Sequence, residues 1–280
     1  MRPRIPGGAM SERRDDSSYQ VPGLERGLRL LEAFGRDNPE MTLAELTRKL
    51  ELPRATAFRL VTTLERLGYL QKVSDRKAYR LGSRVLRLGF EYLASQDMVA
   101  TAHAHLERLS KETGASAHLG VLDGTEVLYL DRVAGWKHLV SNVGIGTRFP
   151  AHATTMGRVL LAGLGDDTVR ELYRNQALPR ATPQTPGTID ELIRQLGSER
   201  NRGYAASFSG FEAGLSSVAA PVMNGFGRTV AAISLAGPDS QFDRRDVEGE
   251  IRRKVCGTAV AISAALGAAP PADGTLKAAE

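Results

Sequence analysis

Cysteine is almost absent from this chain, which has Cys256 as its single copy in 280 residues. One cysteine excludes an internal disulfide and a metal site built from cysteine pairs. Its apolar, helix-like surroundings predict a buried and unreactive thiol. Such low cysteine usage fits a protein of the reducing cytoplasm, and we expect the chain to work there.

Long hydrophobic runs are missing as well. No apolar run approaches the roughly 18–20 residues that span a bilayer, so we expect no membrane partner. The first 20 residues are charged and lack the apolar core of a secretory signal. We expect residues 1–20, which are rich in charge, and residues 268–280, which are of low complexity, to be disordered tails.

Signatures of catalysis are also lacking. The chain contains no Gly-x-Ser-x-Gly nucleophile elbow, although a hydrolytic triad can be imagined from Ser207, His152 and Asp131. His103 and His105 are two positions apart in a predicted helix, so their side chains diverge and make a poor metal pair. The Gly-Ile-Gly segment lacks the strand-to-helix context of a dinucleotide fingerprint. We therefore predict no enzyme, no cofactor and no metal site.

What the chain does contain is a compact pattern over residues 42–82. Thr42 and Glu45 form a Thr-x-x-Glu capping box at the start of a short helix. Pro53 suits the first turn of a second helix, which we expect to end at Gly68 as a C-terminal cap. A hairpin with a basic tip follows. Two short helices and a basic hairpin indicate a winged helix-turn-helix.

A further helix is predicted just upstream, from residue 21 to Gly35. Its apolar stripe should pack behind the other two helices and complete a three-helix core. The stripe consists of Leu24, Leu28, Leu31 and Phe34, with Leu30 added. Residues 21–82 then form one DNA-binding domain.

Charge separates this domain from the rest of the chain. Residues 1–82 carry 16 Lys and Arg against 11 Asp and Glu, a net charge of +5, whereas residues 83–280 carry 21 of each. A basic excess confined to one module is typical of a surface that binds nucleic acid phosphates. The alternative is an ordinary helical hairpin with a solvated charged face, which the helix pattern alone favours equally.

The DNA-binding residues are predicted from the polar face of the second helix and from the hairpin. Helix ends in this motif direct short polar and basic side chains at base edges and phosphates, and a basic hairpin can contact a phosphate strand or the minor groove. The predicted set is Thr42, Arg54, Thr56, Phe58, Arg59, Thr62, Arg76, Lys77 and Arg80.

Residues 83–97 form a predicted linker helix. Its apolar surface is too wide for a free linker, and we expect it to pack on the same helix of a second subunit. The alternative is packing on its own domain. Residues 98–267 then form a second domain, in which a helix from Met98 to Glu112 precedes hairpin-like strands.

The second domain should hold a mainly antiparallel sheet with helices packed on it, which is an α+β fold. Strands are expected at residues 117–122, 126–131, 139–143, 204–208, 217–223 and 229–236. Helices are expected at residues 154–163, 166–175, 188–201 and 243–266, and residues 144–150 as a loop.

Several motifs in matching order resemble the IclR family of bacterial transcription regulators. In the first half they are LERGLRLLEAF, LPRATAFRLVTTLERLGYL and YRLGSRVLRLG, and in the second half LDGTEVLYLDRV, GTRFPAHATTMGRVLLA, RGYAASFSGFEAGLSSVAAPV and GRTVAAISLAGP. The resemblance runs from about Val21 to Leu266. It implies a winged helix-turn-helix, a GAF-like effector domain, and dimers or dimers of dimers on double-stranded operator DNA.

The resemblance also implies control by a small organic or aromatic acid. The VLRLGFEYL stretch is most similar to the branch that controls aromatic-acid degradation by the β-ketoadipate route. Two positions depart from the family pattern. Glu51 stands where relatives usually have glycine, so the turn either avoids a positive φ or accepts strain. Ala55 stands where many have serine, which removes one phosphate or base contact.

The family's effector site, transferred by motif, lies between the sheet and the loop before the domain's first central helix. Hydroxyls and free amides at that helix start suit a carboxylate, and Met156 and Leu215 would supply apolar walls. The implied residues are Thr155, Met156, Ser207, Leu215, Ser217, Ser234 and Ala236. Ser207 and Phe208 replace acids common in the family, which predicts a less anionic pocket. His152 and Glu212 are interpreted as loop-shaping residues.

The hypothesis is therefore a ligand-responsive transcription regulator, either repressor or activator. One alternative is an architectural DNA-binding protein without an effector, which the large neutral second domain disfavours. The other alternative is a GAF-like enzyme, which the missing nucleophile motif disfavours.

Overall fold

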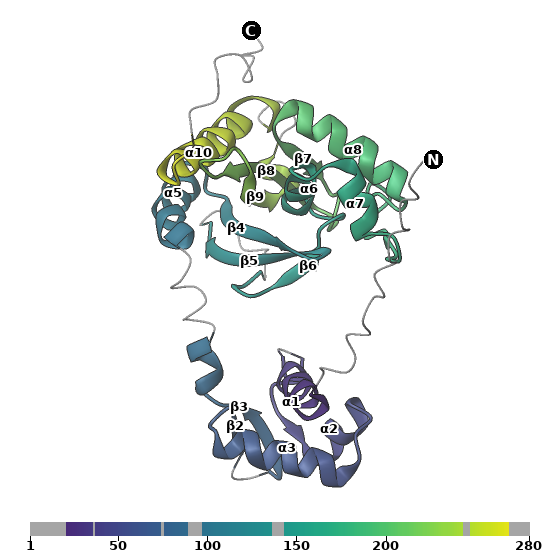
Figure 1. Ribbon diagram of the computed structural model, residues 1–280. Helices are drawn as coiled ribbons and strands as arrows, with labels where there is room; N and C mark the ends of the chain where they lie inside the picture. The colour runs from purple at the N-terminus through teal and green to yellow at the C-terminus, as the bar shows by residue number, and fades with distance from the viewer. Residues whose placement is uncertain are drawn as a thin grey trace, which may run out of the picture. The chain divides into compact units, whose positions relative to one another are not determined.

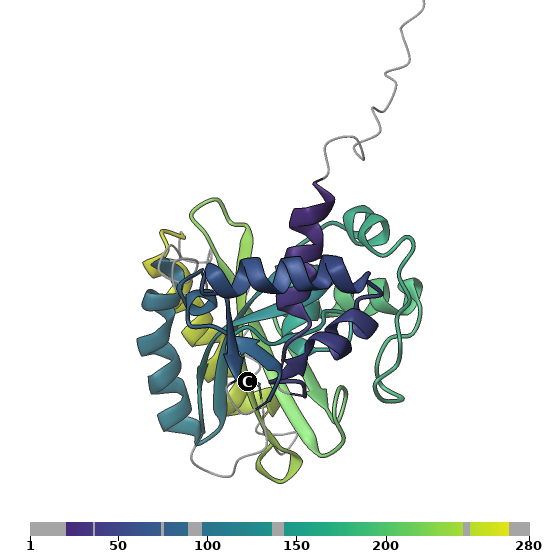
Figure 2. The same ribbon diagram turned by 90° about the horizontal axis from the view of Figure 1, so that it is seen from below.

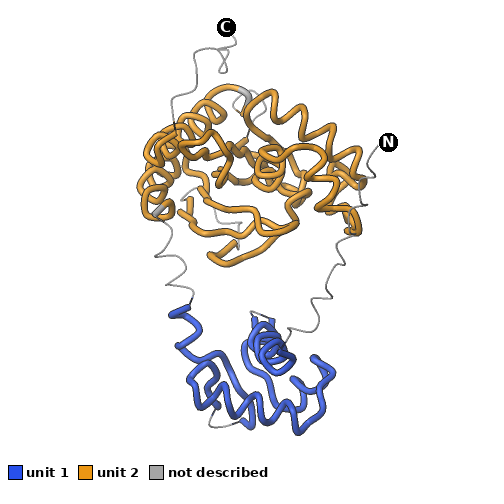
Figure 3. Tube along the Cα trace, viewed as in Figure 1, with its two compact units in different colours: residues 1–94 blue, residues 95–280 orange. Residues whose placement is uncertain are grey.

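The computed structural model describes residues 21–35, 37–73, 76–88, 97–135, 143–242 and 247–268. The predicted N-terminal tail, all of the predicted C-terminal tail except residue 268, and most of the strand expected at residues 139–143 lie outside these ranges. The chain forms two compact units, residues 1–94 and residues 95–280, which are described separately (Figure 3).

The N-terminal unit is a three-helix core with a small antiparallel sheet. Its sheet has the order β1-β3-β2, and α1 crosses α3 (Figure 2). Leu30, Phe34, Leu46, Val61 and Leu70 are among the residues of its core. The elements are α1 (Pro22–Glu32), β1 (Met41–Thr42), α2 (Leu43–Lys49), α3 (Arg54–Arg66), β2 (Leu70–Val73) and β3 (Ala78–Leu81). The predicted winged helix-turn-helix is thus present, and the short strand β1 was not predicted.

The stripe predicted for α1 was partly wrong. Leu30 and Phe34 enter the core, but Leu24 and Leu28 are 61% and 51% exposed. The buried face runs through Gly27 and Leu30 instead, and Gly27 lies beside Leu60 of α3. Leu24 and Leu28 therefore form an uncovered apolar edge of this unit.

The turn between α2 and α3 carries backbone strain. Glu51 has a φ of +53°, a region that a residue with a Cβ adopts at a cost of about 1–2 kcal/mol. The turn at Glu51, where relatives usually have glycine, therefore accepts strain and does not avoid a positive φ. Pro53 is the N-cap of α3 rather than a residue of its first turn. The capping box of Thr42 and Glu45 is present at the start of α2.

The predicted linker helix is described for residues 84–88, which are helical, and the remainder to residue 96 lies outside the described residues. Leu86 and Leu88 are 60% and 58% exposed there. Arg84 donates to the Leu67 carbonyl at 3.0 Å, which ties the start of this segment to the end of α3.

The C-terminal unit is built on a six-stranded antiparallel sheet with the order β6-β5-β4-β9-β8-β7. Helices α5 and α10 cover one face, and α6, α7 and α8 lie on the other side (Figure 1). The strands are β4 (Ser116–Asp123), β5 (Glu126–Val133), β6 (Arg148–Pro150), β7 (Ala205–Phe208), β8 (Leu215–Met223) and β9 (Thr229–Pro238). The helices are α5 (Asp97–Thr113), α6 (Thr155–Ala162), α7 (Asp166–Leu172), α8 (Ile189–Arg202) and α10 (Arg252–Ala265).

The α+β prediction for this unit is correct, with local differences. Residues 148–150 form β6 rather than a loop, because they pair with residues 126–128 of β5. The closing helix has an additional π-helical start at Val247–Ile251. Among the described residues, no helix combines the length and apolar character needed to cross a membrane.

Candidate functional site

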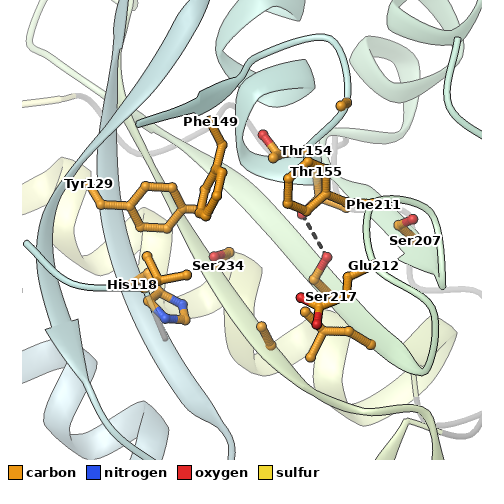
Figure 4. Close-up of a pocket in the computed structure, with 14 residues that line it drawn as sticks. His118, Tyr129, Phe149, Thr154, Thr155, Ser207, Phe211, Glu212, Ser217 and Ser234 are labelled. Carbon is orange, nitrogen blue, oxygen red and sulfur yellow. Dashed lines mark hydrogen bonds between the residues drawn. The ribbon is translucent and has the colours of Figure 1, made fainter. Parts of the chain in front are cut away.

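A partly enclosed cavity of about 230 Å³ lies in the C-terminal unit, on the sheet face that carries α6 (Figure 4). Its walls come from all six strands of the sheet, from the loop before α6 and from the loop after β7. The lining residues are His118, Tyr129, Val143, Phe149, Ala153, Thr154, Thr155, Ser207, Phe211, Glu212, Leu215, Ser217, Ser234 and Ala236.

Cross-strand pairing explains why polar side chains from four strands meet in this wall. Ser207 lies opposite Ser217, and Ser217 lies opposite Ala236. His118 lies opposite Ser234, two residues before Ala236. Residues opposite one another in an antiparallel sheet project from the same face, as do residues two apart in one strand. These side chains therefore share the face that α6 covers.

The start of α6 supplies the second polar wall. Thr154 caps the helix and accepts a 3.1 Å hydrogen bond from the Gly157 amide. Thr155, the first helical residue, places its hydroxyl oxygen 2.9 Å from that of Ser217. Amides of a first helical turn lack intrahelical acceptors and carry the positive end of the helix dipole. The wall therefore suits an anion.

Gly157 lets the loop before α6 fold tightly against the helix. A Cβ at this position would lie 2.2 Å from the Ala151 carbonyl oxygen, so any other residue would displace the loop. Ala153 and Thr154 of this loop line the cavity. The shape of the cavity therefore depends on this glycine.

Four rings form a chain of edge-to-face contacts through the cavity wall. His118 meets Tyr129 with ring centres 5.6 Å apart, Tyr129 meets Phe149 at 5.7 Å, and Phe149 meets Phe211 at 5.1 Å. Such contacts stabilise a fixed arrangement of rings. Burial raises the pKa of Tyr129, so its phenol stays protonated near neutral pH. The wall is therefore aromatic along this side, and the Tyr129 phenol carries no charge there.

His118 is the buried polar residue of that chain. It is 2% exposed, and among the described residues neither of its ring nitrogens has a hydrogen-bond partner. Burial is the main cause that lowers the pKa of His118 to about 3, and the nearby positive charge of Arg132 adds to the effect. The imidazole is therefore neutral at physiological pH.

The loop after β7, residues 209–214, closes one side of the cavity with Phe211 and Glu212. Asp239 holds this loop, since its carboxylate accepts hydrogen bonds from Ser209 at 2.6 Å and from Ser216. Ser209 has a φ of +52°, so the turn is strained as well as anchored.

A second anchor holds the same loop from the opposite side. The Gly210 carbonyl accepts hydrogen bonds from Thr182 at 2.9 Å and from Thr185 at 2.8 Å. With both sides tied down, the position of Phe211 over the cavity is defined by the surrounding chain. Glu212 is exposed at the cavity edge, and its backbone carbonyl accepts a hydrogen bond from the Leu215 amide within this turn.

The structure brings together six of the seven residues implied for the effector site. Thr155, Ser207, Leu215, Ser217, Ser234 and Ala236 all line the cavity. Met156 was predicted as an apolar wall and lies instead in the core at 1% exposure. Its sulfur points at the sheet, where a Cβ on Gly120 would approach it to 2.5 Å. Helical geometry turns Met156 about 100° away from Thr155, so one faces the cavity and the other the core.

Sequence reasoning missed the aromatic wall. Phe149 lies in a segment interpreted as a loop, and Phe211 lies between two predicted strands. Tyr129 and His118 were assigned to strands without a face. Alternation along β4 and β9, with small or polar residues at every second position, was the signal that could have revealed the face. His152 has the predicted structural role, since its Nε2 lies 3.0 Å from the Pro179 carbonyl oxygen.

The predicted DNA-binding residues lie on α3, at the start of α2 and in the wing of the N-terminal unit. Arg54, Phe58, Arg59 and Thr62 are exposed on α3, while Thr56 is half-buried. Arg76 and Lys77 are exposed in the hairpin turn.

Two members of the predicted set also have partners within the unit. The Thr42 hydroxyl is part of the capping box with Glu45, so this threonine caps the start of α2 whether or not it contacts DNA. Arg80 donates to the Gln71 side chain across the hairpin at 3.1 Å and remains exposed.

Among the described residues, no group of three His, Cys, Asp or Glu side chains is arranged to hold a metal ion. Burial raises the pKa of Cys256 to about 11, so the thiol is a poor nucleophile. His103 contacts Asp131 at 2.8 Å, but this pair lies between α5 and β5, away from the cavity lining.

Comparison with known proteins gives matches over both units. Residues 23–74 match the IclR helix-turn-helix domain, and residues 90–264 match the bacterial transcriptional regulator IclR C-terminal domain. The chain is 32% identical to the HTH-type transcriptional regulator XynR of Escherichia coli K12 over 247 residues, which cover 88% of this chain and 98% of XynR.

Solved structures show the same two-domain architecture. A transcriptional regulator from Rhodococcus sp. RHA1 superimposes with a TM-score of 0.78 at 36% identity, covering 88% of this chain and 98% of that one. An IclR homologue from Microbacterium hydrocarbonoxydans, complexed with 4-hydroxybenzoate, superimposes with a TM-score of 0.75 at 29% identity, covering 87% and 98%.

Proposed function

Because this chain belongs to the IclR family of bacterial transcriptional regulators, we propose that a small carboxylic acid in the cavity of the C-terminal unit controls its binding to operator DNA. Membership in the family makes it a DNA-binding regulator rather than an enzyme. A regulator of this kind acts on chromosomal DNA, and we assign it to the cytoplasm on that ground.

The cavity is the observation that carries the proposal of an effector. A cavity of about 150 Å³ is large enough to take up benzene. The present cavity, of about 230 Å³, therefore has room for one aromatic ring and its substituents. Phe149 and Phe211 offer ring edges to such a ligand. The complex of the Microbacterium homologue with 4-hydroxybenzoate supports an aromatic acid as the class of ligand.

The carboxylate of the acid fits the wall formed by Thr155 and Ser217. Their hydroxyls are 2.9 Å apart, and the first amides of α6 lie at the same wall. Among the residues that the structure describes, the lining of the cavity includes no lysine or arginine. Neutral donors at a helix start, rather than a formal positive charge, would therefore hold the anion.

Operator binding is assigned to α3 and the wing. Arg54 and Arg59 are exposed on α3, and Arg76 and Lys77 are exposed in the wing. This arrangement matches a recognition helix in the major groove with a basic hairpin beside it. The net charge of +5 over residues 1–82 supports binding to phosphates by the same unit.

The assembly is proposed to be a homodimer, or a dimer of dimers. Leu24 and Leu28 form an exposed apolar edge on α1, and Leu86 and Leu88 are exposed in the linker segment. Apolar groups left open on a small basic unit are typical of an interface. A second copy of the chain, bound through these edges, would present two α3 helices to two operator half-sites.

A thermal-shift panel tests the effector proposal directly. The full-length protein is heated with benzoate, 4-hydroxybenzoate, pyruvate and the uncharged analogue benzamide. We expect at least one acid to raise the unfolding temperature and benzamide to have little effect, because a ligand at 100 times its Kd stabilises by about 2.7 kcal/mol. If no acid changes either the unfolding temperature or operator binding, the architectural alternative holds.

A further inference from the structure

His118 is a buried side chain whose polar atoms the fold leaves unused. It is 2% exposed, and neither ring nitrogen has a partner among the described residues. A phenylalanine at this position would fill a similar volume and keep the edge contact with Tyr129. Unpaired polar atoms in the interior weaken a fold. Packing therefore does not explain the imidazole.

The side chain faces the cavity. His118 and Ser234 lie opposite one another on β4 and β9, and both line the cavity wall (Figure 4). We call these two residues the inner polar patch. Ser234 is also buried, so its hydroxyl adds a second hydrogen-bonding group beside the imidazole.

The inner polar patch is separated from the Thr155–Ser217 wall by about the length of one substituted ring. His118 and Ser217 are two strands apart across the sheet and two residues apart along it. With strands spaced by about 4.8 Å and residues by about 3.4 Å, their Cα atoms are about 12 Å apart. A gap of this length has space for a single substituted ring with a hydrogen bond at each end.

The charge state of His118 defines what it can recognise. Burial lowers the pKa of His118 to about 3, so the ring is neutral and offers one N–H donor and one acceptor nitrogen. Arg132 lies opposite His118 on β5 and makes this end of the cavity electropositive. A hydroxyl oxygen is compatible with both conditions, whereas a cationic substituent is repelled.

We propose that His118 binds a hydroxyl substituent on the ring of the effector, so that the natural ligand is a hydroxylated aromatic carboxylate. The Thr155–Ser217 wall holds the carboxylate, and the inner polar patch holds the hydroxyl. This inference rests on the proposed function, because it requires that an aromatic acid occupies the cavity. It assigns to His118 the discrimination between hydroxylated and plain aromatic acids.

The test is a two-by-two comparison by isothermal titration calorimetry. Wild type and His118→Phe are each titrated with benzoate and with 3- and 4-hydroxybenzoate. We expect one hydroxybenzoate to bind wild type about tenfold more tightly than benzoate, since loss of one well-formed hydrogen bond weakens binding about tenfold. In His118→Phe this preference falls to less than twofold while benzoate binding is retained. His105→Phe, a half-buried residue of α5, is the matched control and should keep the wild-type preference.

The outcomes separate the inference from the proposed function. Equal binding of benzoate and both hydroxybenzoates to wild type overturns the inference and leaves the effector proposal standing. An equal loss for all three acids in His118→Phe also overturns it, because His118 would then hold the carboxylate or shape the pocket. No binding of any acid to any protein removes the proposed function, and the inference with it.

The unfolding temperature of the unliganded protein distinguishes a binding role of His118 from a structural one. His118→Phe removes two unpaired polar atoms, so the unliganded variant should unfold at the same temperature as wild type or higher. A lower unfolding temperature would show that the fold needs the imidazole. In that case the change in ligand preference would be read from His118→Gln, which retains a donor and an acceptor and should keep part of the preference.

Discussion

Thr155 and Ser217 are 62 residues apart in the chain, yet their hydroxyl oxygens lie 2.9 Å apart in the wall of the cavity. The contact joins the first residue of α6 to strand β8 of the sheet. Neither hydroxyl has to serve the other, because each can turn its proton toward a ligand. This pair is therefore the part of the cavity best suited to an anion.

Thr155→Val should weaken binding of the aromatic acid by about tenfold, because it removes one hydroxyl at nearly constant volume. The fold should be retained, since valine fills the same space beside Ser217. Calorimetric titration with the best acid of the panel gives the affinity. Thr168→Val, an exposed change on α7, is the matched control and should bind as wild type does. Unchanged affinity in Thr155→Val would remove this residue from the site.

Arg59→Ala should weaken operator binding by about tenfold and leave acid binding intact, because Arg59 is exposed on α3 and the cavity lies in the other unit. The dependence of operator affinity on salt should also become shallower if Arg59 contacts a phosphate. Fluorescence anisotropy at several salt concentrations measures both effects. Arg108→Ala, on the exposed face of α5, is the control. If Arg59→Ala and Arg108→Ala bound the operator with equal affinity, the assignment of Arg59 to the DNA-binding face of α3 would be contradicted.

Leu24→Glu should shift the protein toward monomers, because a carboxylate on the apolar edge of α1 cannot be buried against a second copy without a partner. Sedimentation velocity over a range of concentrations measures the change. Phe226→Glu is the control, since Phe226 is 90% exposed at the β8–β9 turn of the other unit. A dimer of unchanged strength in Leu24→Glu would place the interface elsewhere.

Glu51→Gly should stabilise the N-terminal unit by about 0.5–1 kcal/mol. The backbone at Glu51 has a φ of +53°, where glycine is free of the strain that a Cβ causes. The gain is reduced because glycine also loses more entropy on folding. Urea unfolding gives the free energy. Glu40→Gly, at an exposed residue without a positive φ, should instead destabilise slightly, so a loss of stability in both variants would argue against strain at Glu51.

Acid should destabilise the C-terminal unit through His118. Its folded pKa of about 3 lies below the value of about 6.5 expected in the unfolded chain, so the unfolded chain binds a proton that the folded chain refuses. Stability is full above pH 6.5 and falls by about 1.4 kcal/mol per pH unit between pH 6.5 and 3. His118→Phe should reduce this slope, as measured by unfolding at several pH values. An identical slope in the variant would mean that His118 is accessible to protons in the folded state.

His103 should act in the opposite direction. Its hydrogen bond to Asp131, with Glu107 nearby, raises the pKa of His103. Its stabilisation is therefore present below the unfolded pKa and is lost as pH rises through the folded value. Because the side chain is half exposed, solvent screens the effect. His103→Gln should flatten the loss of stability on the alkaline side in the same unfolding series, and a curve that matches wild type would remove the pair as a source of stability.

The order and type of most elements could be predicted from local patterns. The Thr42–Glu45 capping box, the glycine after α3 and the Asp-Gly turn between β4 and β5 are signals within a few residues, and local sterics and hydrogen bonds decide them. The strand β6 was missed because three residues carry too little pattern and are held by pairing with β5. The stripe of α1 was misplaced because the helix packs on its neighbours through Gly27 and Leu30, and packing between helices is decided by the tertiary structure.

The amino-acid sequence by itself determined the two domains, the basic charge of the N-terminal unit, the antiparallel sheet and the hydroxyls available to a ligand. Only the tertiary structure decided which of them meet. It turned Met156 into the core and Thr155 into the cavity, although the two are adjacent, because successive helical residues point about 100° apart. It also joined His118, Tyr129, Phe149 and Phe211 into one wall, since their positions depend on strand register and on a loop held from two sides.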